Sequence, residues 1–259
     1  MSADQLEPTQ SKIRRRKNDQ YDLPLGELSQ SHDFSGRVNY SIVPKWADAG
    51  RETNLVYEAR PGEGRKGNTR SVLKNGEKFT IRFPKTLLRE RGLLGGETSV
   101  TLLSPEEGRV QIVLPEPFEH IHEFHPVDNV ASKEKIPTKR MGPGREYEKY
   151  RLFLPTQYNR HYEDLPRTTR WSLAIAGGQP ALAMTFIDED DVDEENMLVS
   201  KRRTKISGES GHQMEQIAVF PPIGLVDALG WYDSPVGLIP EEDRIVFVPD
   251  PAGSPMDLK

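Results

Sequence analysis

The chain has 259 residues, which is enough for one large domain or two to three small ones. Apolar residues make up 35% of it and charged residues 29%, so the sequence predicts a lean core and polar connecting segments. The absence of cysteine excludes disulfides, thiolate metal sites and a cysteine nucleophile, and no stretch reaches the roughly 20 apolar residues of a membrane-spanning helix. Because the start of the chain also lacks the apolar core of a signal peptide, we expect a cytoplasmic protein that does not enter a membrane.

The formal net charge of -5 is unevenly distributed. Residues 65–91 carry nine basic and two acidic side chains, a formal charge of +7, whereas residues 188–196 read DEDDVDEEN. Segregation of this kind is typical of an anion-binding face with counter-charged linkers. A solvated, acid-rich surface with incidental basic patches would give a similar pattern, and the sequence leaves that alternative open.

In chain order, residues 1–36 come first and are polar, with the basic run KIRRRK at 12–17 and few large apolar side chains. They are predicted to form a flexible basic arm. A folded block is predicted next, over 37–114. Its first part, 37–67, shows a strand-like run, Pro44 and a short helical stretch, and whether it is a true repeat of the unit at 70–114 stays open.

The clearest unit spans 70–114. Lys78–Phe83 alternates between polar and apolar residues and predicts a strand, Pro84 opens a short helix, and Gly92 ends it with a left-handed cap. The runs ETSVTLL and GRVQIVL then predict a hairpin whose turn lies at 105–108.

The same order of elements recurs at 214–250, where the distance from Pro222 to Gly230 equals that from Pro84 to Gly92. A degenerate copy is predicted at 147–187, with Gly177 and Gly178 in its hairpin turn. Polar segments separate the units. They are a linker at 115–146, an acidic and then basic connector at 188–213, and a tail at 251–259.

The unit at 70–114 resembles the AbrB/SpoVT family of swapped-hairpin DNA-binding domains, which includes the MazE-type antitoxins. The resemblance rests on a basic lead-in, Ile81 to Pro84, the helix that ends in Gly92-Leu93, the pair Gly96-Glu97, and the apolar run at 110–114. We therefore expect a mainly β protein with short helices, built from repeated swapped-hairpin barrel units joined by polar linkers. Whether the barrels form within one chain or between chains of a homo-oligomer stays open, because a single unit leaves strand edges unpaired.

The resemblance implies a transcriptional regulator or nucleoid-associated protein that binds double-stranded DNA. Arginine can form two hydrogen bonds to guanine or to a phosphate, and a basic segment gains affinity by releasing counterions. For Lys85, Arg89 and Arg91 an ordinary solvated helix face is the alternative interpretation. The predicted DNA-binding residues are Arg70, Lys74, Lys78, Arg82, Lys85, Arg89 and Arg91.

The competing hypothesis is a protein–protein interaction or assembly module, or an antitoxin that binds a partner protein through degenerate barrels. Enzyme signatures are scarce, so we expect neither catalysis nor a cofactor. His120, His122 and His125 in EHIHEFHP could in principle ligate zinc, but no second cluster with suitable spacing accompanies them. We expect no functional metal there.

Overall fold

A computed structural model describes the fold as two compact units, the first mainly from Met1–Glu119 and the second from His120–Val226 and Gly230–Lys259. The described residues are 6–30, 34, 36–45, 54–62, 69–121, 130–138, 147–154, 162, 164–207, 214–231 and 235–249. Within these ranges no helix is long and apolar enough to cross a membrane.

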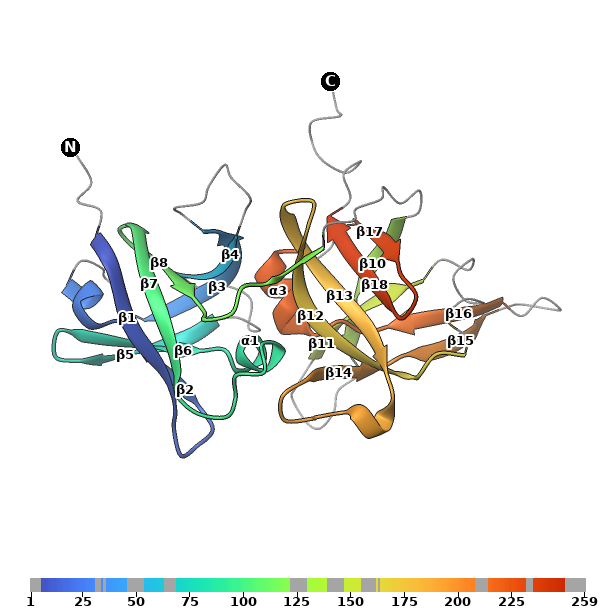
Figure 1. The fold of residues 1–259 in the computed structure, drawn as a ribbon, viewed down its shortest axis with the longest axis horizontal. Coiled ribbons are helices and arrows are strands. Elements are labelled where there is room, and N and C mark those ends of the chain that lie inside the picture. The colour runs from blue at the N-terminus through green and yellow to red at the C-terminus, as the bar shows by residue number, and fades with distance from the viewer. Residues whose placement is uncertain are drawn as a thin grey trace, which may run out of the picture. The chain divides into compact units, whose positions relative to one another are not determined.

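The first unit is a closed antiparallel barrel of eight strands (Figure 1). The strand order around it is β1-β2-β6-β5-β3-β4-β8-β7. A short 3-10 helix at Gly26–Gln30 follows β2, and α1 (Lys85–Glu90) connects β6 to β7. The strands are β1 (Leu6–Arg15), β2 (Tyr21–Pro24), β3 (Arg37–Pro44), β4 (Leu55–Pro61), β5 (Thr69–Asn75), β6 (Lys78–Phe83), β7 (Thr98–Glu106) and β8 (Arg109–Val113).

Side-chain alternation along these strands builds the core of the barrel. In β6 the apolar residues Phe79, Ile81 and Phe83 are buried, and the residues between them are half-buried or exposed. Phe83 packs edge-to-face against Tyr40 and Tyr57, with ring centroids 5.2 and 5.7 Å apart. The strand predicted over Lys78–Phe83 is therefore confirmed, and its alternation places one set of residues inside and the other outside.

The second unit is a ten-stranded antiparallel sheet (Figure 1). Its path is β14-β12-β13-β18-β17-β10-β11-β16-β15, and β9 (Glu119–Ile121) pairs with β12. A 3-10 helix at Glu189–Asp191 precedes β14, and α3 (Ile223–Leu229) connects β16 to β17. The other strands are β10 (Val130–Thr138), β11 (Tyr147–Phe153), β12 (Thr168–Ala176), β13 (Gln179–Ile187), β14 (Leu198–Lys201), β15 (Arg203–Ser207), β16 (Met214–Val219), β17 (Pro235–Pro240) and β18 (Arg244–Pro249).

The two units share one strand connectivity. Each pairing of the first barrel has a counterpart in the second sheet when β1 to β4 are matched with β10 to β13, β5 with β14 and β15, and β6 to β8 with β16 to β18. The end strands β14 and β15 are separated in the chain by Arg202 alone, so together they take the place of the single strand β5. The recurring connectivity is thus that of a whole eight-strand unit.

The predicted fold class, mainly β with short helices, is confirmed. Segments 70–114 and 214–250 each contain a strand, a short helix and a hairpin, and both helices end at a glycine with positive φ, Gly92 at 66° and Gly230 at 69°. Segment 147–187 pairs with segment 214–250 within one sheet, through β13 with β18 and β11 with β16. The finer prediction, that swapped-hairpin units of this size repeat along the chain, is not confirmed.

Three segments predicted to lack regular structure contain strands. The predicted arm, 1–36, contributes β1 and β2 to the closed barrel. The predicted linker, 115–146, contributes β9 and β10, and the predicted connector, 188–213, contributes β14 and β15. Of the β1 side chains that the structure describes, Ile13 alone is buried, so the strand needs few apolar residues. Its backbone pairing with β7 and β2 holds it in the barrel. The tail at 251–259 lies outside the described residues.

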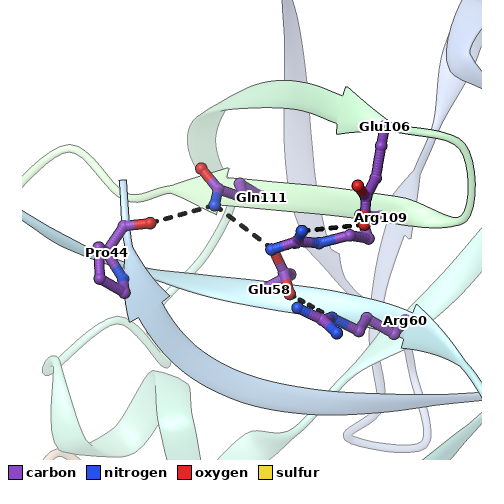
Figure 2. A network of polar contacts seen from close by, with 6 residues as sticks. All are labelled: Pro44, Glu58, Arg60, Glu106, Arg109 and Gln111. Atoms are coloured by element: carbon purple, nitrogen blue, oxygen red, sulfur yellow. Dashed lines mark hydrogen bonds and ion pairs between the residues drawn. The ribbon is translucent and has the colours of Figure 1, made fainter. Parts of the chain in front are cut away.

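A buried carboxylate links β4 to β8 in the first barrel (Figure 2). Glu58 is fully buried and lies directly opposite Gln111 on β8. Its Oε2 accepts hydrogen bonds from Arg109 Nη2 at 2.8 Å and Nε at 3.1 Å, and from Gln111 Nε2 at 3.4 Å. Arg60 pairs with the other carboxylate oxygen.

Two of the groups that bind Glu58 form further contacts of their own. Gln111 also donates to the carbonyl of Pro44 at 3.2 Å, and Arg109 forms a second ion pair with Glu106 at 2.9 Å. The hydrogen bond with Glu58 raises the pKa of Arg109 above its usual value. Removing one partner of a buried ion pair leaves the other charge uncompensated, which strongly lowers the stability of the folded state.

Glu58→Ala should therefore lower the free energy of unfolding of the first barrel by about 2–4 kcal/mol, because Arg109 and Gln111 lose a buried acceptor. The matched control is Glu106→Ala, which removes an exposed carboxylate from the same guanidinium and should cost less than about 1 kcal/mol. Urea unfolding followed by near-ultraviolet circular dichroism measures both. Equal losses would contradict the central role of Glu58.

Candidate anion-binding site

A pocket of about 300 Å³ lies on the first barrel, where β2, β3, β5 and β6 approach the start of α1. It contains four basic side chains and one carboxylate. The lining residues are Asp19, Gln20, Tyr21, Arg37, Thr69, Arg70, Ser71, Arg82, Phe83 and Lys85. We call this the first pocket.

Strand register brings these side chains together. Arg82 on β6 lies opposite Asp22 on β2, and Arg37 on β3 lies opposite Ser71 on β5. Because β6 buries Phe79, Ile81 and Phe83, Arg82 leaves the strand on its outer face. The same alternation in β3, where Val38 and Tyr40 are buried, sends Arg37 outward.

Arg82 has an unsatisfied donor in the first pocket. Its Nε is buried and has no hydrogen-bond partner among the described residues. Its carbonyl accepts a hydrogen bond from the Tyr40 hydroxyl at 3.0 Å, which fixes the backbone beneath the guanidinium. A buried N–H without an acceptor is costly, so an incoming anion would be favoured here.

Arg70 adds a second half-buried guanidinium. Burial, and to a smaller extent the positive charge of Arg37, lower the pKa of Arg70 below its usual value. One of its N–H groups donates to the carbonyl of Thr69 at 2.9 Å. Burial together with a neighbouring like charge disfavours the charged form, and a bound anion would oppose both effects.

Lys85 and Asp19 form an ion pair within the lining of the first pocket. Asp19 sits in the turn between β1 and β2 with a φ of 59°, a left-handed conformation that aspartate adopts more readily than most residues. The hydrogen bond from Lys85 lowers the pKa of Asp19 below its usual value, so the carboxylate is ionised at neutral pH. The carboxylate thus offsets part of the positive charge of the pocket.

Of the seven predicted DNA-binding residues, the structure brings three together in this pocket: Arg70, Arg82 and Lys85. Lys74 and Lys78 lie further along the β5–β6 hairpin, and both are exposed. The Nζ atom of Lys74 lies 5.3 Å from the centroid of the Phe79 ring. Arg89 lies on α1, half-buried, with a buried Nε that has no partner among the described residues.

Arg91 is engaged within the protein. One of its terminal nitrogens donates to the carbonyls of Glu116 and Pro117, both at 2.6 Å, and its guanidinium lies 4.8 Å from the centroid of the Phe118 ring. These contacts hold the segment after β8 against α1. A DNA contact from Arg91 stays a prediction.

Sequence reasoning missed Arg37 and the role of the run KIRRRK. Arg37 is the outward residue that begins the alternating strand RVNYSIVP, and this alternation was the available signal. In KIRRRK, Lys12 and Arg14 pair with Glu97, whereas Arg15 pairs with Asp19 and Arg16 with Asp22. The run is therefore part of β1 and of the turn that borders the first pocket.

The histidine cluster falls largely outside the described residues. His120 lies in β9 and is half-buried, and His122 and His125 lie outside the described ranges. Within those ranges no three or more His, Asp or Glu side chains are grouped closely enough to hold a metal ion.

Comparisons of the chain with protein-family models, with curated proteins and with solved structures find no match. The resemblance to the AbrB/SpoVT family therefore stays a prediction. What the described residues establish is a mainly β protein whose first barrel carries a cationic pocket.

Asp19→Asn should tighten the binding of inorganic phosphate to the full chain about two- to threefold, because it removes the carboxylate that lines the first pocket and releases Lys85. Titration followed by isothermal calorimetry at low salt measures the effect. Glu97→Gln is the control, since this exposed carboxylate pairs with Lys12 and Arg14 and does not line the pocket. Weaker binding by Asp19→Asn would instead mean that Asp19 positions Lys85 for the anion.

Proposed function

We propose that the first barrel binds the sugar–phosphate backbone of double-stranded DNA through the first pocket, and that the protein acts as a DNA-binding regulator or nucleoid-associated protein. The observation that carries this proposal is the convergence of Arg37, Arg70 and Arg82 on one pocket, with the Arg82 Nε buried and without an acceptor among the described residues. Guanidinium groups match phosphate oxygens in charge and in planar donor geometry.

The positions of the exposed lysines favour a long anionic ligand. Lys74 and Lys78 extend the cationic surface from the first pocket along the β5–β6 hairpin. Phosphates spaced along a duplex can meet both the pocket and the hairpin, whereas a small anion can meet only the pocket. The predicted sequence-independent affinity of the +7 segment fits this arrangement.

Arg82→Ala should weaken the binding of a short random-sequence duplex about tenfold at low salt and lower the salt slope by about one, because an arginine on phosphate releases about one counterion. Fluorescence anisotropy between about 50 mM and about 200 mM salt measures both quantities. For the wild type, the three guanidinium contacts alone predict a slope of about -3 in a plot of log affinity against log salt concentration. The hairpin lysines would make this slope steeper.

The matched control for Arg82→Ala is Arg170→Ala, which removes an exposed arginine from β12 in the second unit. It should leave the affinity and the salt slope unchanged. If the wild-type chain shows no affinity for duplex DNA even at low salt, the proposal fails, and the assembly-module hypothesis then has to be tested with protein partners.

The β5–β6 hairpin gives a separate prediction. The double variant Lys74→Gln/Lys78→Gln should lower the salt slope by up to about two and leave phosphate binding in the first pocket unchanged, because neither lysine lines the pocket. Anisotropy with duplex DNA and calorimetry with inorganic phosphate separate the two effects. A parallel loss of phosphate binding would contradict a division between pocket and hairpin.

A further inference from the structure

A second pocket, of about 360 Å³, lies on the second unit. It is lined by Tyr150, Ser200, Lys201, Arg203, Phe220, Pro221 and Ile223. All of these residues belong to the second unit, so this pocket, which we call the second pocket, can be described from that unit alone.

The second pocket occupies the place in its unit that the first pocket occupies in the barrel. Each pocket is lined by the strand that pairs with the first strand of a hairpin. In the first unit Thr69 on β5 lies opposite Asn39 on β3, and in the second unit Ser200 on β14 lies opposite Thr169 on β12. Both also use the residue that begins the helix after a proline. The carbonyl of Pro84 accepts the first helical hydrogen bonds before Lys85 and that of Pro222 does so before Ile223, so Lys85 and Ile223 are equivalent.

The chemistry of the equivalent positions differs. Where the first pocket has Lys85, the second has Ile223, an apolar residue with 37% of its surface exposed. Phe220, Pro221 and the buried Tyr150 complete an apolar wall. An exposed apolar side chain beside an aromatic wall favours a ligand with a flat apolar face.

Two cations stand at the edge of this wall. The guanidinium of Arg203 lies 5.5 Å from the centroid of the Phe220 ring, so it is in cation–π range of that ring. Lys201 pairs with Glu189 at 2.7 Å, but both side chains are about two-thirds exposed, at 69% and 66%, and an exposed pair of this kind exchanges readily for another anion.

Ser200, which also lines the second pocket, is hydrogen-bonded to the core of its unit. Ser200 Oγ accepts a hydrogen bond from Trp171 Nε1 at 2.8 Å, and its carbonyl accepts one from the Thr169 hydroxyl at 2.9 Å. Trp171 is fully buried and stacks on Phe247, with ring centroids 5.9 Å apart. The second pocket is therefore built on the packed core of its unit.

We propose that the second pocket binds a nucleotide, with its base against Phe220 and Ile223 and its phosphate at Lys201 and Arg203. A base supplies the flat π-face that the apolar wall fits, and its phosphate supplies the anion. A free mononucleotide and an unpaired nucleotide of a single strand share this chemistry. The proposal is independent of duplex binding by the first pocket, because no residue is common to the two pockets.

Isothermal calorimetry with the full chain tests the proposal using adenosine monophosphate, inorganic phosphate and an oligothymidylate of about eight nucleotides. We expect adenosine monophosphate to bind at least about tenfold more tightly than inorganic phosphate at this site, because stacking of the base adds to the ionic contact. A tighter oligothymidylate whose binding is weakened by Arg203→Ala and not by Arg82→Ala would identify a single strand as the source of the nucleotide, and equal affinities would identify the free mononucleotide.

Two kinds of variant separate the parts of the site. Arg203→Ala and Lys201→Ala should each weaken nucleotide binding about fivefold or more. Ile223→Ser, at a position with 37% of its surface exposed, should weaken binding of adenosine monophosphate and leave binding of inorganic phosphate unchanged. Near-ultraviolet circular dichroism of the buried Trp171 checks that each variant remains folded.

Arg82→Ala is the control, because it alters the first pocket and should leave nucleotide affinity unchanged. Absence of nucleotide binding by the wild type, or loss of that binding in Arg82→Ala with none in Arg203→Ala, would overturn the proposal. Absence of nucleotide binding by the wild type does not bear on duplex binding, and loss of duplex binding in Arg82→Ala does not bear on the second pocket.

Discussion

The first barrel depends on one strand to close it. β1 pairs with β7 from Leu6 to Ile13, with an irregularity between Leu6 and Thr9, and then with β2 through Arg14 and Arg15. Without β1, the edges of β2 and β7 would be open, and open edges expose unpaired backbone groups. The same strand carries the chain into the turn that holds Asp19, so the first pocket is complete only in the closed barrel.

Closure also fixes which side chains face the solvent. Alternation within each strand forces the residues between buried positions onto the outer face, so burying Phe83 commits Arg82 to the surface. The cationic pocket is thus a consequence of the core rather than of a loop. Groups held by strands are positioned more rigidly than groups on loops, and rigid positioning lets several guanidiniums meet one ligand.

The sequence predicted what local patterns determine. The alternation of Lys78–Phe83, the proline before each helix and the glycine after it gave β6, α1 and α3 with their ends. It failed where tertiary pairing decides, as in β1, whose strand identity comes from hydrogen bonds to β7. Arg70 and Arg82, which line the candidate pocket, lie in the basic segment and could be selected from the sequence, whereas Arg37 joins them only through the pairing of β3 with β5.

The two units have the same strand connectivity, but their pockets are lined by different side chains. The comparison shows what the fold determines and what the side chains determine. Strand order sets the place, because in both units the strand that follows the central hairpin passes beside the start of the short helix. Residue type sets the chemistry at that place. Lys85 and Ile223 begin equivalent helices, and this difference, together with Phe220 and Pro221 in the second pocket against Arg82 in the first, makes one lining cationic and the other largely apolar. A property inferred for one unit therefore cannot be carried to the other by position, and each pocket has to be argued from its own side chains.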